Sequence, residues 1–317
     1  MSSENNLLDD FFIQETENPN TQTTHLWEND EITKARERDR IGRRIRVLIT
    51  VKTFPRFSTK YSETVCVAGI ALDPARWVRL YPIPFRYLAK TDQFKKYDII
   101  EINVSQPKKD WRIESLHVDI GSIEIISSLG SNNGWARRAQ YVEPMRQTPL
   151  CVLREQIAED LNGPSLGLVR PAPGTFRLEI TDFPGWTPEE RARRDEILKS
   201  QDIALNESLQ RTLVPLLKEP RFNIHACFKC ESPNCNGHRI GLIDWEATAL
   251  QYREKGSDED VARIIRERFE RNPTSPSKDL RIFVGNQNTA PKRRNFEALG
   301  LYYPSKDAAA SVRNVLF

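Results

Sequence analysis

Three thiols and one imidazole fall within one short segment, Cys227-Phe-Lys-Cys230-Glu-Ser-Pro-Asn-Cys235-Asn-Gly-His238, at the spacing C-x2-C-x4-C-x2-H. The C-x2-C spacing lets two thiolates reach one ion across a tight turn, and the Pro, Asn and Gly residues favour the turn that brings the second pair back. Four protein ligands leave no coordination position for water. The spacing therefore predicts a structural Zn2+ held by Cys227, Cys230, Cys235 and His238. Three cysteines that cluster without a metal are the alternative.

Two carboxylates, Asp244 and Glu246, follow this segment directly. On a β-strand they would share a face, which is the arrangement that nucleases use to hold Mg2+. A restriction-type nuclease also has a lysine two residues beyond a carboxylate on that strand, and Ala247 and Thr248 stand there instead. The pattern therefore favours a non-catalytic protein in which Asp244 caps a helix or supports a metal ligand. A Mg2+-dependent nuclease that uses Asp244 and Glu246 is the alternative.

Aromatic and cationic residues alternate most densely between Arg76 and Tyr87, and again in Lys108-Lys-Asp-Trp-Arg112. On a strand, Trp77, Arg79 and Tyr81 would point to one side. Ring faces on which bases stack, next to guanidinium groups that contact phosphates, are typical of a single-stranded nucleic-acid groove. Core rings flanked by unrelated arginines are the alternative. We expect binding of single-stranded DNA or RNA by Trp77, Arg79, Tyr81, Arg86, Arg137, Arg138 and Arg293.

The net charge of +3 hides an uneven distribution along the 317 residues. Residues 1–33 carry eight acidic side chains and no Lys or Arg, which leaves +11 for the remainder. The basic excess gathers in Lys34–Arg46, Trp135–Arg138 and Pro291–Arg294. Such patches attract polyanions, although any single run is also compatible with a solvated surface.

The composition of residues 1–33 predicts a disordered acidic tail. Within it, the acidic and apolar cluster Leu7–Ile13 could dock onto a protein partner, so a protein-protein adaptor is a further alternative function. An inert tail is the other interpretation. A charged helix with interleaved signs is expected over residues 34–46.

Short β-type runs separated by Pro and Gly follow over residues 47–130, without long helical patterns between them. Strands of this length and spacing predict an OB-like barrel. For residues 131–317 we expect a second OB-like unit that contains the zinc loop, with flanking helices that begin near Thr187 and Ser257. The predicted fold class is therefore α+β, with small OB-like barrels, a zinc-stabilised loop and flanking helices.

The sequence resembles a family of uncharacterised prokaryotic dual-OB-domain proteins. The resemblance is carried by Cys66-Val-Ala-Gly69, Trp77-Val-Arg79, the Cys-x2-Cys loop and Asp244-Trp-Glu246, and it covers roughly residues 47–305. It implies OB-like barrels and, by analogy of fold, nucleic-acid contact in a prokaryotic defence system, such as antiviral defence. The acidic tail and the basic helix depart from the family pattern.

The remaining cysteines, Cys66 and Cys151, lie in apolar contexts that are typical of small buried hydrophobes. No signal peptide and no apolar run long enough for a membrane span is visible in the sequence. We therefore expect a cytoplasmic protein with no membrane partner.

Overall fold

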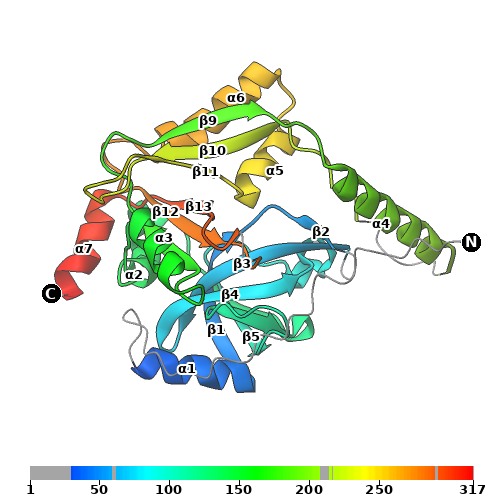
Figure 1. Cartoon of the computed structure of the whole chain (residues 1–317), viewed down its shortest axis with the longest axis horizontal. Helices are drawn as coiled ribbons and strands as arrows, with labels where there is room; N and C mark the ends of the chain where they lie inside the picture. Colours follow the sequence, from blue (N-terminus) through cyan, green and yellow to red (C-terminus); the bar gives the residue numbers. More distant parts are fainter. Residues whose placement is uncertain (1–29, 59–61, 208–213, 216, 290–291, 317) are drawn as a thin grey trace, which may run out of the picture.

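The computed structural model describes residues 30–58, 62–207, 214–215, 217–289 and 292–316, which form a mixed α+β fold (Figure 1). A β-barrel occupies one end of the molecule, and two small sheets with their helices lie over it. The α+β fold class expected from the sequence is confirmed.

Five strands close the barrel in the order β1-β3-β4-β6-β5, and β5 returns to pair with β1. The pair β4–β6 is parallel and the other four pairs are antiparallel. A five-stranded Greek-key barrel with this order has the OB topology. The barrel strands are β1 (Arg43–Lys52), β3 (Ser62–Leu72), β4 (Ala75–Ile83), β5 (Asp98–Ser105) and β6 (Ser115–Val118), with β2 (Arg56–Ser58) added to β3 and β7 (Glu124–Ser128) added to β5.

Strand β1 shows how the sequence builds this barrel. Ile45, Val47 and Ile49 point into the barrel core, whereas Leu48 and Val51 belong to a second cluster outside it. Alternate residues of a strand face opposite sides, so a strand that is apolar on both sides must be covered on both. The outer cover is the second unit, which packs on β1 through Leu168, Phe283 and their neighbours.

The second unit contains two antiparallel sheets of three strands each, in the orders β13-β12-β8 and β11-β10-β9. The pairings of the described residues close one barrel only, the first one, so these open sheets stand where we expected a second barrel. The strands are β8 (Leu166–Val169), β9 (Arg177–Asp182), β10 (Phe222–Phe228), β11 (His238–Gly241), β12 (Arg281–Asn286) and β13 (Phe296–Tyr302).

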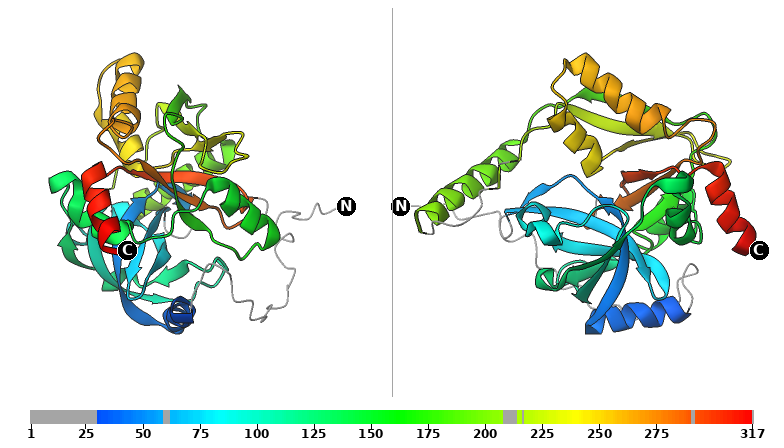
Figure 2. Two further views of the ribbon diagram at one scale, coloured as in Figure 1. Left: turned by 90° about the vertical axis from the view of Figure 1, so that its left-hand side faces the viewer. Right: turned by 180° about the vertical axis from the view of Figure 1, so that it is seen from behind.

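Helices cover the sheets of the second unit, and α4 extends away from the rest of the molecule (Figures 1 and 2). These helices are α2 (Asn132–Val142), α3 (Leu150–Glu159), α4 (Pro188–Glu207), α5 (Trp245–Arg253), α6 (Asp258–Arg266) and α7 (Lys306–Leu316). The short helical turns are η1 (Phe85–Tyr87), η2 (Lys90–Asp92), η3 (Ile120–Ser122) and η4 (Glu267–Arg271). Among the described residues, no helix is both long enough and apolar enough to span a membrane.

The charged helix α1 (Asp30–Ile41) begins before, and ends before, the range expected from the sequence. Gly42 follows it with a φ of +118°, in the left-handed region that favours glycine at a helix end. The basic residues Arg43 to Arg46 therefore belong to strand β1 and not to the helix. Asp39 of α1 is buried and pairs with Arg76 of the barrel.

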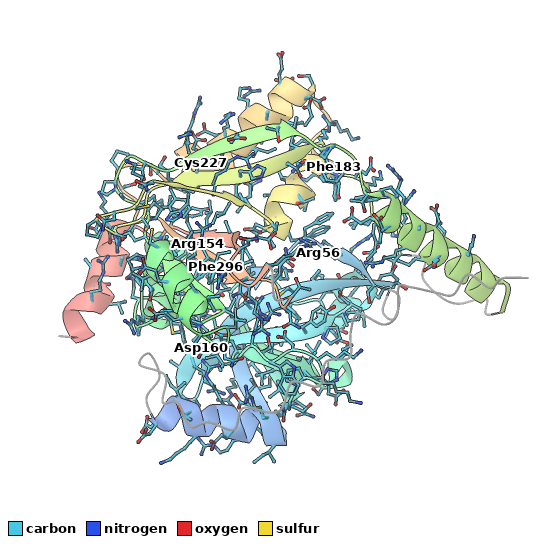
Figure 3. The ribbon with its side chains drawn as sticks, in the orientation of Figure 1. Arg56, Arg154, Asp160, Phe183, Cys227 and Phe296 are labelled. Carbon is cyan, nitrogen blue, oxygen red and sulfur yellow. The ribbon has the colours of Figure 1, made fainter. Side chains whose placement is uncertain are left out.

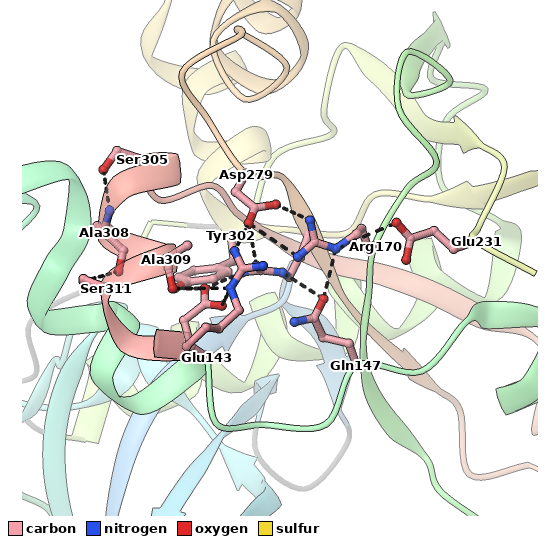
Figure 4. A network of polar contacts seen from close by, with 12 residues as sticks. Glu143, Gln147, Arg170, Glu231, Asp279, Tyr302, Ser305, Ala308, Ala309 and Ser311 are labelled. Carbon is pink, nitrogen blue, oxygen red and sulfur yellow. Dashed lines mark hydrogen bonds and ion pairs between the residues drawn. The ribbon is translucent and has the colours of Figure 1, made fainter. Parts of the chain in front are cut away.

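A buried ion network joins α2, α7 and the β12–β13 sheet (Figure 4). Arg281 on β12 is fully buried and pairs with Glu143 and with Asp279, and the hydroxyl of Tyr302 donates to Glu143. Arg313 of α7 pairs with the same two carboxylates. Buried charges are tolerated only when paired in this way, so the network fixes how these elements meet.

Candidate functional site

One cluster of cysteine and histidine ligands lies between α3 and the segment that joins β10 to β11. It consists of Cys151, Cys230, Cys235 and His238, whose ligand atoms all lie within 4.8 Å of one another. Cys151 comes from the first turn of α3, and the other three come from the loop that ends at His238. Three of the four are buried and Cys151 is half-buried.

The spacing of the ligand atoms matches a tetrahedral metal site. Zn–S and Zn–N bonds of about 2.3 and 2.0–2.1 Å would place two sulfurs about 3.8 Å apart and a sulfur about 3.6 Å from a nitrogen. The Sγ atoms of Cys151 and Cys230 are 3.7 Å apart. His238 Nε2 lies 3.6, 3.3 and 3.2 Å from the Sγ atoms of Cys151, Cys230 and Cys235. This cluster could therefore hold a metal ion of that size after shifts of a few tenths of an ångström.

Cys227 lies outside the cluster, and Cys151 takes the place that we expected it to fill. On β10, Ala226 and Phe228 face the core of the second unit, so their neighbour Cys227 points to the opposite side of the sheet. Its Sγ lies 3.9 Å from a carboxylate oxygen of Glu179. Figure 3 shows Cys227 on the outer sheet, away from Arg154 on α3. Cys151 is thus a cluster member and not only a small buried hydrophobe.

The electrostatics of the cluster fit a divalent cation. Burial, with hydrogen bonds from the neighbouring thiols, raises the pKa of Cys151 to about 12, and burial lowers the pKa of His238 to about 4. Thiolates packed this closely repel one another unless a cation lies between them. Arg154 Nη1 lies 3.3 Å from His238 Nδ1, and metal binding at Nε2 would place the ring proton on Nδ1. Arg154 would then release this contact.

A cleft of about 900 Å³ opens on the barrel surface where the second unit meets it. The strands β3 and β4 form its floor, the segment between β1 and β3 forms one wall, and the β5–β6 loop forms the other. OB barrels bind oligonucleotides on this same face, between these same two loops. The rings that line it are Phe54, Phe57 and Tyr81, and the cationic residues that line it are Arg56, Arg79, Lys108, Lys109 and Arg112.

The two units of the chain correspond to two family models. The model described as "Domain of unknown function (DUF8757)" matches residues 146–316, which is more than half of the chain. The chain belongs to this family. The model described as "Domain of unknown function (DUF8758)" matches residues 43–144. No curated protein matches the chain.

All four residues of the cysteine cluster lie within the DUF8757 segment. The cleft is shared, because its floor and both loop walls belong to the DUF8758 segment. Ile243, Asn286 and Glu297 are among the lining residues that the DUF8757 segment contributes. The metal cluster is therefore a property of one segment, and the cleft lies where the two segments meet.

The expected stacking face of β4 is divided by the structure. Tyr81 is 43% exposed and lines the cleft. Trp77 is half-buried and packs edge-on against Phe283, with ring centroids 5.9 Å apart, so it belongs to the contact between the units. Arg79 is only 2% exposed and donates to Cys66 Sγ at 3.0 Å and to the carbonyl oxygen of Ser165 at 3.1 Å.

Three of the remaining arginines that we expected to contact nucleic acid have partners within the protein. Arg86 pairs with Glu63. Arg138 stacks 4.0 Å from the ring centroid of Tyr97 and donates to the carbonyl oxygen of Leu129. Arg293 is buried and donates to backbone oxygens, including that of Leu161 at 2.8 Å.

Arg137 is exposed on α2 and does not line the cleft. Together with the three paired arginines it therefore stands apart from the cleft, which sequence reasoning had not located. The basic and aromatic run that begins at Lys108 is the one signal in the sequence that points to the cleft wall.

The Asp244 and Glu246 pair lies at the start of a helix and not along a strand. Asp244 is the N-cap of α5, and its Oδ1 accepts from the backbone N–H of Glu246 at 2.9 Å. Lys96 Nζ lies 2.8 Å from Asp244 and 3.0 Å from Glu246. Both carboxylates thus share the ammonium group of one lysine from the barrel. The predicted docking cluster Leu7–Ile13 lies outside the described residues.

Proposed function

We propose that the protein binds single-stranded DNA or RNA, without chemistry, in the cleft between the barrel and the second unit. The observation that carries this proposal is the coincidence of a cleft with the oligonucleotide-binding face of an OB barrel. The rings that line the cleft can stack on bases of any sequence. Such stacking gives affinity for single strands without recognition of base pairs in a duplex.

The charges around the cleft support a polyanionic ligand. Lys108 and Lys109 lie on the β5–β6 loop, and Arg56 lies on the opposite wall. Arg56 is 60% exposed at its side chain and its partner Glu297 is 3.8 Å away, so this weak pair can exchange for a phosphate. Phosphate contacts made by such side chains release counterions, and binding then weakens as salt increases.

A salt titration of the affinity for single strands tests the proposal. The affinity should fall with salt at a slope of roughly −0.7 per phosphate contacted. The double variant Lys108→Ala/Lys109→Ala should flatten this slope by about 1.4. The control Arg137→Ala removes an exposed cation outside the cleft and should leave the slope unchanged. If neither variant changes a measurable affinity, the ligand does not occupy this cleft, and absence of any binding would refute the function itself.

For the cysteine cluster we propose a structural Zn2+. Three thiolates and one imidazole are a ligand set that selects zinc, and four protein ligands leave no exchangeable position for catalysis. Metal analysis of the purified protein should give one zinc ion per chain. Another metal, or none after purification without chelators, would contradict this assignment.

A further inference from the structure

The cleft has one closed side, where the second unit is bonded to both of its walls. On one wall, the backbone N–H of Phe54 donates to the carbonyl oxygen of Ile243 at 2.8 Å. On the other wall, Arg112 Nη1 donates to the carbonyl oxygen of Asn286 at 2.6 Å, and Asn288 Nδ2 donates to that of Lys109 at 2.8 Å. The two loops that flank an OB groove are therefore both joined to the same neighbour.

The floor is joined to the second unit at the same side. Arg79 Nη2 and the backbone N–H of Asn286 both donate to the carbonyl oxygen of Ser165, at 3.1 and 3.0 Å. With the floor and both walls bonded to the second unit, the described residues close this side of the groove to a polymer. One backbone hydrogen bond and two buried guanidinium groups, those of Arg79 and Arg112, hold most of the closure.

The groove is open where it continues along the barrel. A second hollow adjoins the cleft there and shares Pro82, Ser105 and His117 with it. Every residue that lines this hollow comes from the barrel, within positions 82–121. The exposed Tyr81 lies next to this shared border. Among the described residues, this direction along the barrel surface is the path by which a chain can leave the cleft.

Two unsatisfied polar atoms belong to residues of the closed side. Arg79 Nε and Asn286 Oδ1 are buried and have no hydrogen-bond partner among the described residues. Both residues line the cleft. Buried polar atoms without partners cost free energy, so a polar group of a ligand that reached either atom would be stabilised there.

From these contacts we infer that the cleft receives the end of a single strand, and not a strand that passes through. This inference rests on the proposed function and restricts its substrate to nucleic acid with a free terminus. The terminal nucleotide occupies the closed side beside Arg79 and Asn286, and the rest of the strand leaves past Tyr81.

Binding of a linear and a circular single strand of the same sequence tests the inference. Strands of about 60 nucleotides with an internal fluorophore are long compared with the ~4–16 nucleotides that an OB domain covers, so the curvature of the circle is negligible. The full chain should bind the linear strand at least tenfold more tightly than the circle, and a circle that has been cut once should regain the affinity. The bound linear strand should carry one protein per recognised end, whatever its length.

Equal affinity for the linear and circular strands would overturn the inference and leave the proposed function intact. A strand blocked by a bulky group identifies the inserted end, because only a block at that end should weaken binding. Blocks at both ends that leave the affinity unchanged would also overturn the inference. No binding of either strand would refute the proposed function along with it.

Discussion

The cysteine cluster and the cleft are built in opposite ways. The cluster brings four ligand atoms to within 4.8 Å, mostly buried, whereas the cleft spreads rings and cations over strands and loops of the barrel where it borders the second unit. Metal binding in the cluster depends on four atoms, whereas ligand binding in the cleft depends on many side chains over a surface. Loss of one ligand should therefore damage the fold, while loss of one cleft side chain should damage only binding.

The largest effect is expected for Cys151→Ser, because it removes one ligand of the cluster. Loss of a structural metal is among the changes that cost about 4 kcal/mol or more. Zinc content should fall well below one ion per chain, and the midpoint of denaturant unfolding should fall with it. Cys227→Ser is the matched control, since Cys227 lies on β10 just before the loop that holds three of the ligands, but outside the cluster.

The two cysteine variants also distinguish the arrangement in the structure from the spacing in the sequence. Retention of zinc in Cys151→Ser together with its loss in Cys227→Ser would show that the C-x2-C pair binds the ion after all. The metal site would then consist of Cys227, Cys230, Cys235 and His238, all within one short segment of the chain.

A smaller effect, confined to binding, is expected for Tyr81→Ala. Removal of one stacking ring costs about 1–3 kcal/mol, which is roughly a tenfold to hundredfold loss of affinity for single strands. Because the side chain is 43% exposed, the unfolding midpoint should change little. Tyr81→Phe keeps the ring and should keep the affinity. A large loss of stability in Tyr81→Ala would instead mean that Tyr81 stabilises the fold, as the cysteine cluster does.

The smallest effect concerns Lys52, a buried cation on the strand that leads into the cleft wall. Burial lowers its pKa from 10.5 to about 8, although it donates to the carbonyl oxygen of Phe94 and lies over the ring of Phe85. The unfolded chain then binds more protons than the folded chain between pH 8 and 10.5. The free energy of unfolding therefore increases with pH across that window. Below pH 8 the cost of burying the charge is fully present.

Lys52→Met removes this burial cost. Relative to the wild type, its free energy of unfolding should be higher by about 1–2 kcal/mol at pH 7, and the difference should shrink as pH approaches 10.5. Unfolding in denaturant at a series of pH values measures the difference. A constant difference over this range would mean that the Lys52 ammonium titrates normally in the folded protein.

Local patterns in the sequence were sufficient to predict the barrel. Its strands are short, apolar and separated by Pro and Gly, and the structure has the OB-like barrel that these runs predict. Helix α2 was not expected, because its sequence Asn-Asn-Gly-Trp-Ala begins with turn residues and lacks an apolar stripe. Its place is fixed by contacts with α7, a helix that is distant from it in the sequence.

Three of the four cluster residues were expected from their spacing, and the fourth was not. Cys151 lies 79 residues before Cys230, and nothing in its own neighbourhood distinguishes it from a core cysteine. The C-x2-C spacing was compatible with a shared ion, but it does not report to which side of a strand each thiol points. Strand β10 turns Cys227 away, and only the tertiary fold brings Cys151 near.

The arginines show the same limit for the cleft. Arg79 and Arg293 were counted as surface cations, yet both are buried with backbone carbonyl partners. Composition records the charge of a guanidinium and not its partners. The cleft itself depends on how two segments meet, and no motif in either segment encodes that meeting.

The distance along the chain between Cys151 and the other cluster residues has a consequence for biosynthesis. A nascent chain that has been translated only as far as α3 holds a single thiol of the set, and the remaining ligands emerge from the ribosome about 80 residues later. Full coordination must therefore wait until His238 has left the exit tunnel. Capture of the ion would then be a late checkpoint of maturation, and zinc starvation should yield chains whose barrel is folded while the remainder is open to proteases.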